Sequence, residues 1–242
     1  MKYALITGGS RGIGREICLK LAEDGYSIII NYKANEEKAK EVKKAIEDIG
    51  GKAELLPFDT SSPQSIEEAM ERWQSKNQDS HISVLVHNAG ITDDSLLFMM
   101  SDSQWHNVLD TSLNGFFYLS RLIVKDMMAS RWGRIVVVSS LSGVKGMAGQ
   151  VNYSAAKGAL ISASKALAIE VARRGVTVNV VAPGFIRTDM TGHLSEMDLK
   201  ATIPMGRFGQ ASEVAEAVAF FASEKSSYIT GTVLNVNGGL YT

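Results

Sequence analysis

Tyr153 and Lys157 are the pair of residues whose types and spacing most directly suggest chemistry. On a helix, positions i and i+4 lie on one face, so the phenol and the ammonium can share one site. A lysine at about 4 Å, with an effective dielectric of about 20, favours the phenolate by about 4 kcal/mol and lowers the tyrosine pKa, although burial of the phenol opposes this shift. The pair therefore predicts a proton donor that works near neutral pH.

A glycine-rich turn, Thr7-Gly8-Gly9-Ser10-Arg11-Gly12-Ile13-Gly14, makes this pair informative, because a Tyr-x-x-x-Lys spacing alone occurs by chance in many helices. The turn lies between a short apolar run and an amphipathic stretch, which predicts a strand, a turn and a helix. Gly8 would permit a tight turn, Gly12 the close approach of a pyrophosphate, and Gly14 close packing of the helix. The helix N-terminus would favour the pyrophosphate charge. The alternative is an ordinary strand-to-helix turn, and four glycines within positions 8–14 argue against it.

The composition is typical of a soluble globular protein, with 45 % hydrophobic and 21 % charged residues. The length of 242 residues suits one α/β domain, so we expect 1–242 to form a single domain. The net charge of −1 gives no indication of nucleic-acid binding. A single cysteine (Cys18), no recognisable signal peptide and no apolar stretch near the required ~20 residues predict a cytoplasmic protein without a membrane segment.

Strand-like and helix-like segments alternate along the chain. Apolar runs predict strands at 3–6, 27–32, 54–58, 82–87, 134–139, 177–181 and 232–236. Amphipathic stretches predict helices at 13–24, 35–49, 107–128 and 153–173, one that starts at Pro63 behind a Ser62 cap, and one from a Ser212 cap through Ser223. The alternation predicts an α/β fold, a single Rossmann-like doubly wound parallel sheet of about seven strands with helices on both faces.

The ligand crevice of such a sheet lies beyond the C-terminal ends of its strands. The turn at Gly8, the segment 87–90, Ser140 and the segment 183–184 all fall at such ends. We therefore expect four segments that are far apart in the sequence to converge on one cleft.

Together these motifs resemble the short-chain dehydrogenase/reductase family over essentially the whole chain. The segments 178–186 and 188–190 further resemble the branch of 3-oxoacyl-(acyl-carrier-protein) reductases. The motifs that carry the resemblance are the turn 7–14, Asn88-Ala89-Gly90, Ser140, Tyr153 with Lys157, 179–184, 229–232 and 237–239. By resemblance, the chain is a single NADP-binding domain of this family.

The resemblance implies a role for each polar residue of the predicted site. Tyr153 would be the general acid in reduction, and Ser140 would donate a hydrogen bond to the substrate carbonyl. Lys157 would hold the ribose hydroxyls of the nicotinamide cofactor and lower the pKa of Tyr153. The alternative for Ser140 is a strand-end hydroxyl that bonds its own backbone, since Ser139 and Ser142 are neighbours.

The cofactor is expected to be NADPH. Strand 27–32 ends without the acidic residue that often accepts from the adenosine ribose in NAD-dependent enzymes, whereas Lys33 and Arg11 could attract a 2′-phosphate. The alternative for Lys33 is a solvated surface charge, and Asp59 resembles an adenine-contacting aspartate. The expected cofactor-binding residues are Gly8, Ser10, Arg11, Gly12, Ile13, Gly14, Lys33, Asp59, Asn88, Ala89, Gly90, Tyr153, Lys157, Pro183, Gly184, Ile186 and Thr188.

Two positions depart from the family pattern. Ser112 stands where the family usually has a catalytic asparagine, and we expect it to weaken or rewire a water relay beside the lysine without abolishing reduction. Asn114 would point away from Ser112 on a regular helix. His87 stands where asparagine is usual, and a hydrogen-bonded structural role is favoured over a catalytic one. The remaining histidines, His81, His106 and His193, have no metal-ligand spacing, so no metal site is expected.

A basic docking face for an acidic acyl carrier protein is expected at Arg131 and Arg174, by resemblance. Arg134 and Arg173 add positive charge nearby, and stabilisation of helix C-termini is the alternative explanation for these cations. The segment 190–205, with Met190, Leu194, Met197 and Leu199, could be a mobile lid over an acyl chain or a plain surface helix. Relatives form a dimer interface from the helices at 107–128 and 153–173 and complete a tetramer through the C-terminal strand, so a homotetramer is expected.

The expected function is NADPH-dependent reduction of a 3-oxoacyl thioester on acyl carrier protein in fatty acid biosynthesis. One alternative is the same chemistry in a dedicated polyketide or polyene pathway, which the departures at Ser112 and His87 favour. The chain could also be an alcohol or sugar dehydrogenase, or a non-catalytic cofactor-binding subunit. The presence of Ser140, Tyr153 and Lys157 together argues against the non-catalytic subunit.

Overall fold

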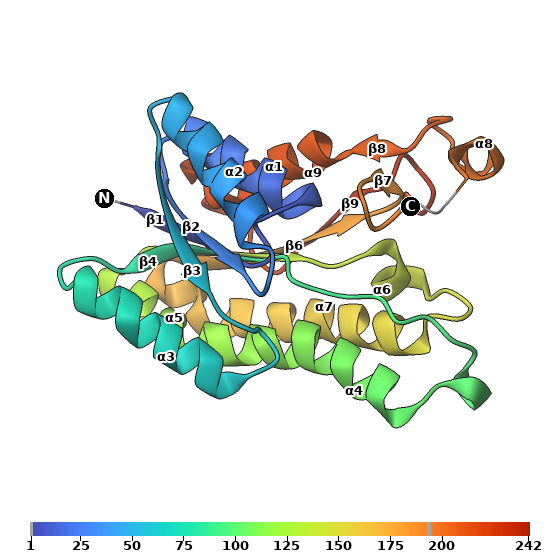
Figure 1. The fold of residues 1–242 in the computed structure, drawn as a ribbon, viewed down its shortest axis with the longest axis horizontal. Coiled ribbons are helices and arrows are strands. Elements are labelled where there is room, and N and C mark those ends of the chain that lie inside the picture. Colours follow the sequence, from blue (N-terminus) through green and yellow to red (C-terminus); the bar gives the residue numbers. More distant parts are fainter. Residues whose placement is uncertain (1, 193–194) are drawn as a thin grey trace.

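The computed structural model describes residues 2–192 and 195–242 and contains a seven-stranded parallel sheet in the order β3-β2-β1-β4-β5-β6-β9 (Figure 1). The predicted doubly wound α/β fold is confirmed, and the order reverses between β1 and β4, where such sheets bind their ligands. The strands are β1 (Tyr3–Ile6), β2 (Ser27–Tyr32), β3 (Lys52–Pro57), β4 (Ile82–His87), β5 (Gly133–Val138), β6 (Val176–Pro183) and β9 (Val233–Val236).

Helices cover both faces of the sheet, as Figure 1 shows. Successive side chains of a strand point to opposite faces, so Ile28 and Ile30 pack in one core while Ile29 packs in the other. This two-sided burial explains the unbroken apolar runs of the strands. One core includes α1 (Gly12–Glu23), α2 (Glu36–Asp48) and α9 (Ala211–Ala222); the other includes α3 (Pro63–Lys76), α5 (Gly115–Ser130) and α7 (Val151–Val171).

Local caps explain where several helices begin. The predicted Ser62 cap of α3 is confirmed, because its side chain accepts from the Ser65 N–H and Pro63 occupies the first turn. The predicted Ser212 cap is wrong, since α9 begins at Ala211 and Ser212 lies inside it. The helix start is instead stabilised by the Glu213 carboxylate, which accepts from the Gln210 N–H at 2.7 Å.

The single helix predicted at 107–128 is interrupted. Helix α4 (Asp102–Leu109) leads into a π turn, η2 (Asp110–Asn114), before α5 begins. The Gly115 N–H reaches back to the Asp110 carbonyl, five residues earlier, which is the hydrogen bond of a π turn. Asn114 turns toward Asp110, to whose Oδ1 it donates at 2.6 Å, so it does not replace Ser112.

Short elements surround the C-terminal edge of the sheet, where α6 (Leu141–Lys145), β7 (Ile186–Arg187), β8 (Gly209–Gln210) and α8 (Glu196–Leu199) gather (Figure 1). The remaining turns are η1 (Leu97–Met99), η3 (Ala172–Arg174), η4 (Lys200–Thr202) and η5 (Glu224–Ser226). No helix within the described part of the chain is long and apolar enough to cross a membrane.

Candidate active site

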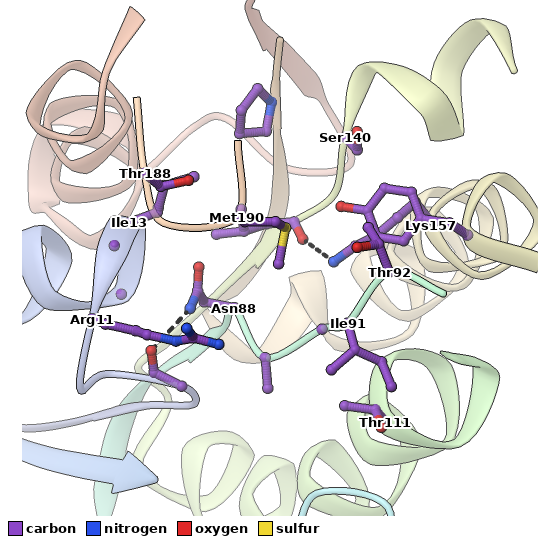
Figure 2. Close-up of a pocket in the computed structure, with 18 of the residues that line it drawn as sticks. Arg11, Ile13, Asn88, Ile91, Thr92, Thr111, Ser140, Lys157, Thr188 and Met190 are labelled. Carbon is purple, nitrogen blue, oxygen red and sulfur yellow. Dashed lines mark hydrogen bonds between the residues drawn. The ribbon is translucent and has the colours of Figure 1, made fainter. Parts of the chain in front are cut away.

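A cavity of about 780 Å³ lies at the C-terminal edge of the sheet, a volume ordinary for a cofactor or ligand site. Every residue expected to bind the cofactor lines it, together with Ser140. Figure 2 shows Arg11 and Thr188 on one side of the cavity, with Ser140 and Lys157 across it. The four segments predicted to converge are therefore brought together, whereas Ser112 does not line the cavity.

The glycine turn between β1 and α1 is a cradle that side chains would fill. Gly8 and Gly12 have positive φ angles of 64° and 54°, which L-residues rarely adopt. A Cβ on Gly14 would clash with the Gly8 carbonyl oxygen, so α1 can pack on the turn only through glycine. The free amides at the start of α1 beside this cradle fit a bound pyrophosphate.

Two polar residues that sequence reasoning missed hold this turn in place. Asn31, buried at the end of β2, accepts from the Gly8 N–H at 3.2 Å and donates to the Phe58 carbonyl at 3.0 Å. Thr7 accepts through its hydroxyl from the backbone N–H groups of Asn88 and Ala89, both at 2.9 Å. An asparagine at the end of an apolar strand was the available signal for Asn31.

Ser140 is distinguished from its neighbours by what each hydroxyl contacts. Ser139 donates to the Lys157 carbonyl at 2.8 Å, and Ser142 donates to Gln150 Oε1 at 2.8 Å. Ser140 Oγ accepts from the Ser142 N–H at 3.1 Å and caps α6, so the alternative of a local backbone bond is also present. Because that bond uses the oxygen as acceptor, the Ser140 hydrogen stays available for another oxygen.

Tyr153 lines the cavity, but its pKa moves in the direction opposite to that expected. Burial raises the pKa of Tyr153 to about 12, a hydrogen bond with Ser140 lowers it in part, and the Asp94 charge raises it. The expected net lowering of the Tyr153 pKa is therefore wrong for this structure. The ammonium lies over the tyrosine ring, 5.6 Å from its centroid, and desolvation of the phenol outweighs any help to the phenolate.

Lys157 is a buried cation, only 2 % exposed. Its Nζ donates to the Val138 carbonyl at 2.9 Å, a bond drawn in Figure 2. Burial lowers the pKa of Lys157 to about 8, so the ammonium stays mostly charged at neutral pH. A Cβ on Gly90 would lie 3.0 Å from this Nζ, so the absence of a side chain there leaves room for the ammonium.

His87 and Ser112 meet beneath the cavity. His87 Nε2 lies 2.7 Å from the Ser112 carbonyl oxygen, which agrees with the favoured interpretation of His87 as a hydrogen-bonded structural residue. The Ser112 side chain is buried, and its Oγ has no hydrogen-bond partner among the residues that the structure describes.

Charges at the other end of the cavity are exposed and paired. Lys33 Nζ lies 2.6 Å from Asp59 Oδ2, and Arg11 lies 3.9 Å from the Asp189 carboxylate. Burial raises the pKa of Asp59, but hydrogen bonds from Lys33 and Ser61 outweigh it, so the pKa is lowered overall. Sequence reasoning counted Lys33 as a free cation and missed this ion pair.

The expected docking arginines lie together but away from the cavity. Arg131 ends α5 in the left-handed region, with φ of 55°. The Arg131 carbonyl oxygen lies so close to Gly175, the residue after Arg174, that a Cβ on this glycine would clash with it. Both side chains are exposed at the N-terminal ends of β5 and β6, whereas the cavity lies at the C-terminal ends. Arg134 cannot belong to a docking face, because it is 2 % exposed and pairs with Glu224 at 3.2 Å.

Several further expectations fall outside the cavity. Of the proposed lid residues, Met190 lines the cavity, whereas Met197 and Leu199 do not. Leu194 and His193 lie outside the described residues. Across 2–192 and 195–242, no group of three or more histidine, cysteine or acidic side chains is arranged to hold a metal ion.

A Rossmann-like sheet with a serine, a tyrosine and a lysine at its C-terminal edge is the arrangement of an oxidoreductase that uses a nicotinamide cofactor. Comparison with known proteins agrees with that class. A family model described as "Enoyl-(Acyl carrier protein) reductase" matches residues 8–241. The chain belongs to the short-chain dehydrogenase/reductase family.

The chain is similar to several proteins named 3-oxoacyl-(acyl-carrier-protein) reductase FabG. It is 46 % identical to those of Salmonella typhimurium, over 243 residues, and Escherichia coli, over 244 residues; each alignment covers 99 % of this chain and 97 % of the relative. It is 43 % identical to that of Staphylococcus epidermidis, with 99 % of both chains covered.

Proposed function

We propose that the protein reduces 3-oxoacyl thioesters carried on acyl carrier protein to the 3-hydroxyacyl form, with NADPH, in fatty acid biosynthesis. One observation carries this proposal most directly. Ser140 and Tyr153 line the same cavity as the glycine cradle, with the buried Lys157 beside the tyrosine. Full-length similarity to FabG proteins from several bacteria supports the substrate class.

The two hydroxyls suit a ketone oxygen that gains negative charge. The Ser140 oxygen accepts from the Ser142 N–H, so its hydrogen is not used in that bond and can turn from Tyr153 to a substrate oxygen. Tyr153, whose pKa is about 12, is a neutral phenol at physiological pH and so holds the proton that the product alkoxide requires. When bound, the reduced nicotinamide supplies the hydride. The two hydroxyls suit an oxygen that becomes an alkoxide. The similarity to FabG proteins favours carbonyl reduction over the carbon–carbon double-bond reduction named in the family description.

Lys157 would act through charge and position. Its buried ammonium keeps further hydrogens after bonding Val138, and these suit the ribose hydroxyls of the cofactor. Its charge also stabilises negative charge that develops on the tyrosine oxygen as the proton leaves, which is an effect on the transition state.

A preference for NADPH rests on the exposed end of the cavity. Arg11 projects from the glycine turn. Among the described residues its one ion-pair partner is the Asp189 carboxylate, at 3.9 Å. Because this contact is long and exposed, Arg11 can reorient toward a phosphate. Lys33 must first leave Asp59, at 2.6 Å, and its contribution is correspondingly smaller.

The carrier would dock on Arg131 and Arg174 and serve the cavity of a second copy of the chain. The eight residues of β6 alone span about 25 Å between the docking edge and the cavity edge. An assembly that sets the docking edge of one copy beside the cavity of another removes this distance, and the homotetramer expected from the family offers such an arrangement.

The proposal is tested with purified protein, NADPH and acetoacetyl thioesters on carrier protein and on a small thiol. We expect NADPH oxidation with both substrates. A crotonyl thioester, which has a double bond in place of the ketone, is the control and should not be reduced. Reduction of the crotonyl substrate alone, or tight NADPH binding without turnover of any substrate, would overturn the proposal.

Charge reversal at Arg131 and Arg174 tests the docking surface separately. We expect a higher KM for the carrier-bound substrate and an unchanged KM for the small thioester. The exposed Lys44 on α2, reversed in the same way, is the control. Equal changes for both substrates would contradict docking.

A further inference from the structure

His87 is a buried imidazole that lies just outside the cavity lining. It is the last residue of β4 and is fully buried. Its Nε2 lies 2.7 Å from the Ser112 carbonyl oxygen. A carbonyl oxygen can only accept a hydrogen bond, so Nε2 must carry the hydrogen and donate it.

The acceptor belongs to the π turn that separates α4 from α5. Such turns interrupt the regular helical hydrogen bonds and occur frequently at functional sites. The His87 ring also packs edge-on against Phe116, with ring centroids 5.7 Å apart, just after the turn. One side chain at the end of a strand therefore fixes the turn through both a hydrogen bond and an aromatic contact.

On its other side, the π turn faces Lys157. A Cβ on Gly90 would lie 3.3 Å from Ser112 Oγ and 3.0 Å from Lys157 Nζ, so both polar atoms border one small space. Ser112 Oγ has no hydrogen-bond partner among the described residues. A displacement of the turn would therefore change the position of the Ser112 hydroxyl relative to the ammonium.

The electrostatics favour an uncharged imidazole at this position. Burial and, to a smaller extent, the Lys157 charge lower the pKa of His87 to about 3, although the hydrogen bond to Ser112 opposes both. The neutral ring can thus donate one hydrogen bond without adding a second positive charge next to Lys157.

We propose that His87 is a positioning residue for reduction: it donates Nε2–H to the Ser112 carbonyl and holds the π turn so that the Ser112 hydroxyl stays beside Lys157. The kinetic consequence of this proposal rests on the function proposed above. The hydrogen bond itself does not, and it can be tested without any turnover.

The first test measures the ¹⁵N chemical shifts of His87 in the full-length protein between pH 5 and pH 9. We expect the tautomer with hydrogen on Nε2, and no titration in this range. The His87→Leu variant assigns the signal by its loss. The opposite tautomer, or titration near pH 6.5, would overturn the proposal.

The second test compares three variants of His87. Glutamine places its amide nitrogen near the position of Nε2, asparagine places it near Nδ1 and cannot reach Ser112, and leucine has no donor. We expect kcat, per NADPH-binding site measured by fluorescence titration, to fall about 10-fold in His87→Leu and His87→Asn and to stay within about 2-fold in His87→Gln. KM for the thioester should change by less than about 2-fold in all three.

The outcomes separate positioning from a purely structural role. If all three variants lower Tm but keep the wild-type kcat per binding site, or if glutamine is no better than asparagine, the positioning role is wrong. An inactive wild-type protein would instead overturn the proposed function, and the NMR measurement would still decide whether the hydrogen bond exists.

Discussion

The two ends of the cavity handle charge in opposite ways. At the buried end, which comprises Ser140, Tyr153 and Lys157, the ammonium is 2 % exposed and its pKa is lowered. At the exposed end, which comprises Arg11, Lys33 and Asp59, the Lys33 side chain is 71 % exposed and already paired. Both ends carry a lysine at the rim of one parallel sheet.

This difference indicates where substitutions should matter. A buried charge is costly to maintain and interacts strongly with its neighbours, because little water screens it. An exposed ion pair contributes about 0–1 kcal/mol. We therefore expect the buried end to control the rate and the exposed end to control only the choice of cofactor, and the following predictions test that division.

The largest effect is expected for Tyr153→Phe, which removes the proton donor and leaves the ring. We predict a decrease in kcat of about 10²- to 10⁴-fold with NADPH affinity nearly unchanged. Steady-state kinetics and fluorescence titration measure the two quantities. Tyr228→Phe, at a fully exposed position, is the control. Turnover at the wild-type rate would show that the buried end does not supply the proton.

Gly90→Ala should also act at the buried end. Its Cβ would approach Lys157 Nζ to 3.0 Å, so the ammonium must move by a few tenths of an ångström, which disturbs its bond to Val138. We predict a decrease in kcat of about 10-fold, with a folded protein by circular dichroism. Gly192→Ala, whose Cβ would meet ordinary contacts of 3.6 Å or more, is the control. Equal kinetics for the two variants would contradict tight packing around Lys157.

The pH profile should report Lys157. With a pKa of about 8, its ammonium is charged below pH 8 and loses the proton above it. We predict that kcat/KM for the free enzyme falls above about pH 8, approaching tenfold per pH unit. His87, with a pKa of about 3, should add no change between pH 5 and pH 8. A profile that stays flat to pH 10 would remove Lys157 from this assignment.

At the exposed end, Arg11→Ala should raise KM for NADPH by about 5- to 10-fold and leave KM for NADH nearly unchanged. The kcat with saturating NADPH should stay close to wild type. Initial rates with both cofactors check this, and a large fall in kcat would contradict the division between the two ends.

The smallest effect is expected for Lys33→Ala, because Asp59 already neutralises that charge at 2.6 Å. We predict a change in KM for NADPH of less than about 3-fold. In the Asp59→Asn protein, where Lys33 is released, the same lysine substitution should cost more. Equal costs in both backgrounds would show that the ion pair does not limit Lys33.

Much of the fold could be predicted because its determinants are local. Apolar runs such as Ile28 to Ile30 specify buried strands, and Ser62 with Pro63 specifies a helix start, whatever the rest of the chain does. The Ser140, Tyr153 and Lys157 constellation was likewise visible from spacing and family resemblance.

What could not be predicted depends on contacts across the fold. The π turn at Asp110–Asn114 breaks an amphipathic pattern that continues on both sides, and its partner, His87, lies on another element. Asn31 resembled only a strand-end residue, yet it holds the glycine turn. The direction of the Tyr153 pKa shift required knowing how far the phenol is desolvated.

Cys18 lies behind the glycine cradle, fully buried on α1. A Cβ on Gly9 would lie 2.8 Å from its sulfur, and burial strongly raises the pKa of the thiol. The closed protein therefore presents no thiolate to an alkylating reagent. Labelling of this sulfur would require α1 to separate from the turn, so its rate would measure how often the cradle opens, and ligands that close the cradle would slow it.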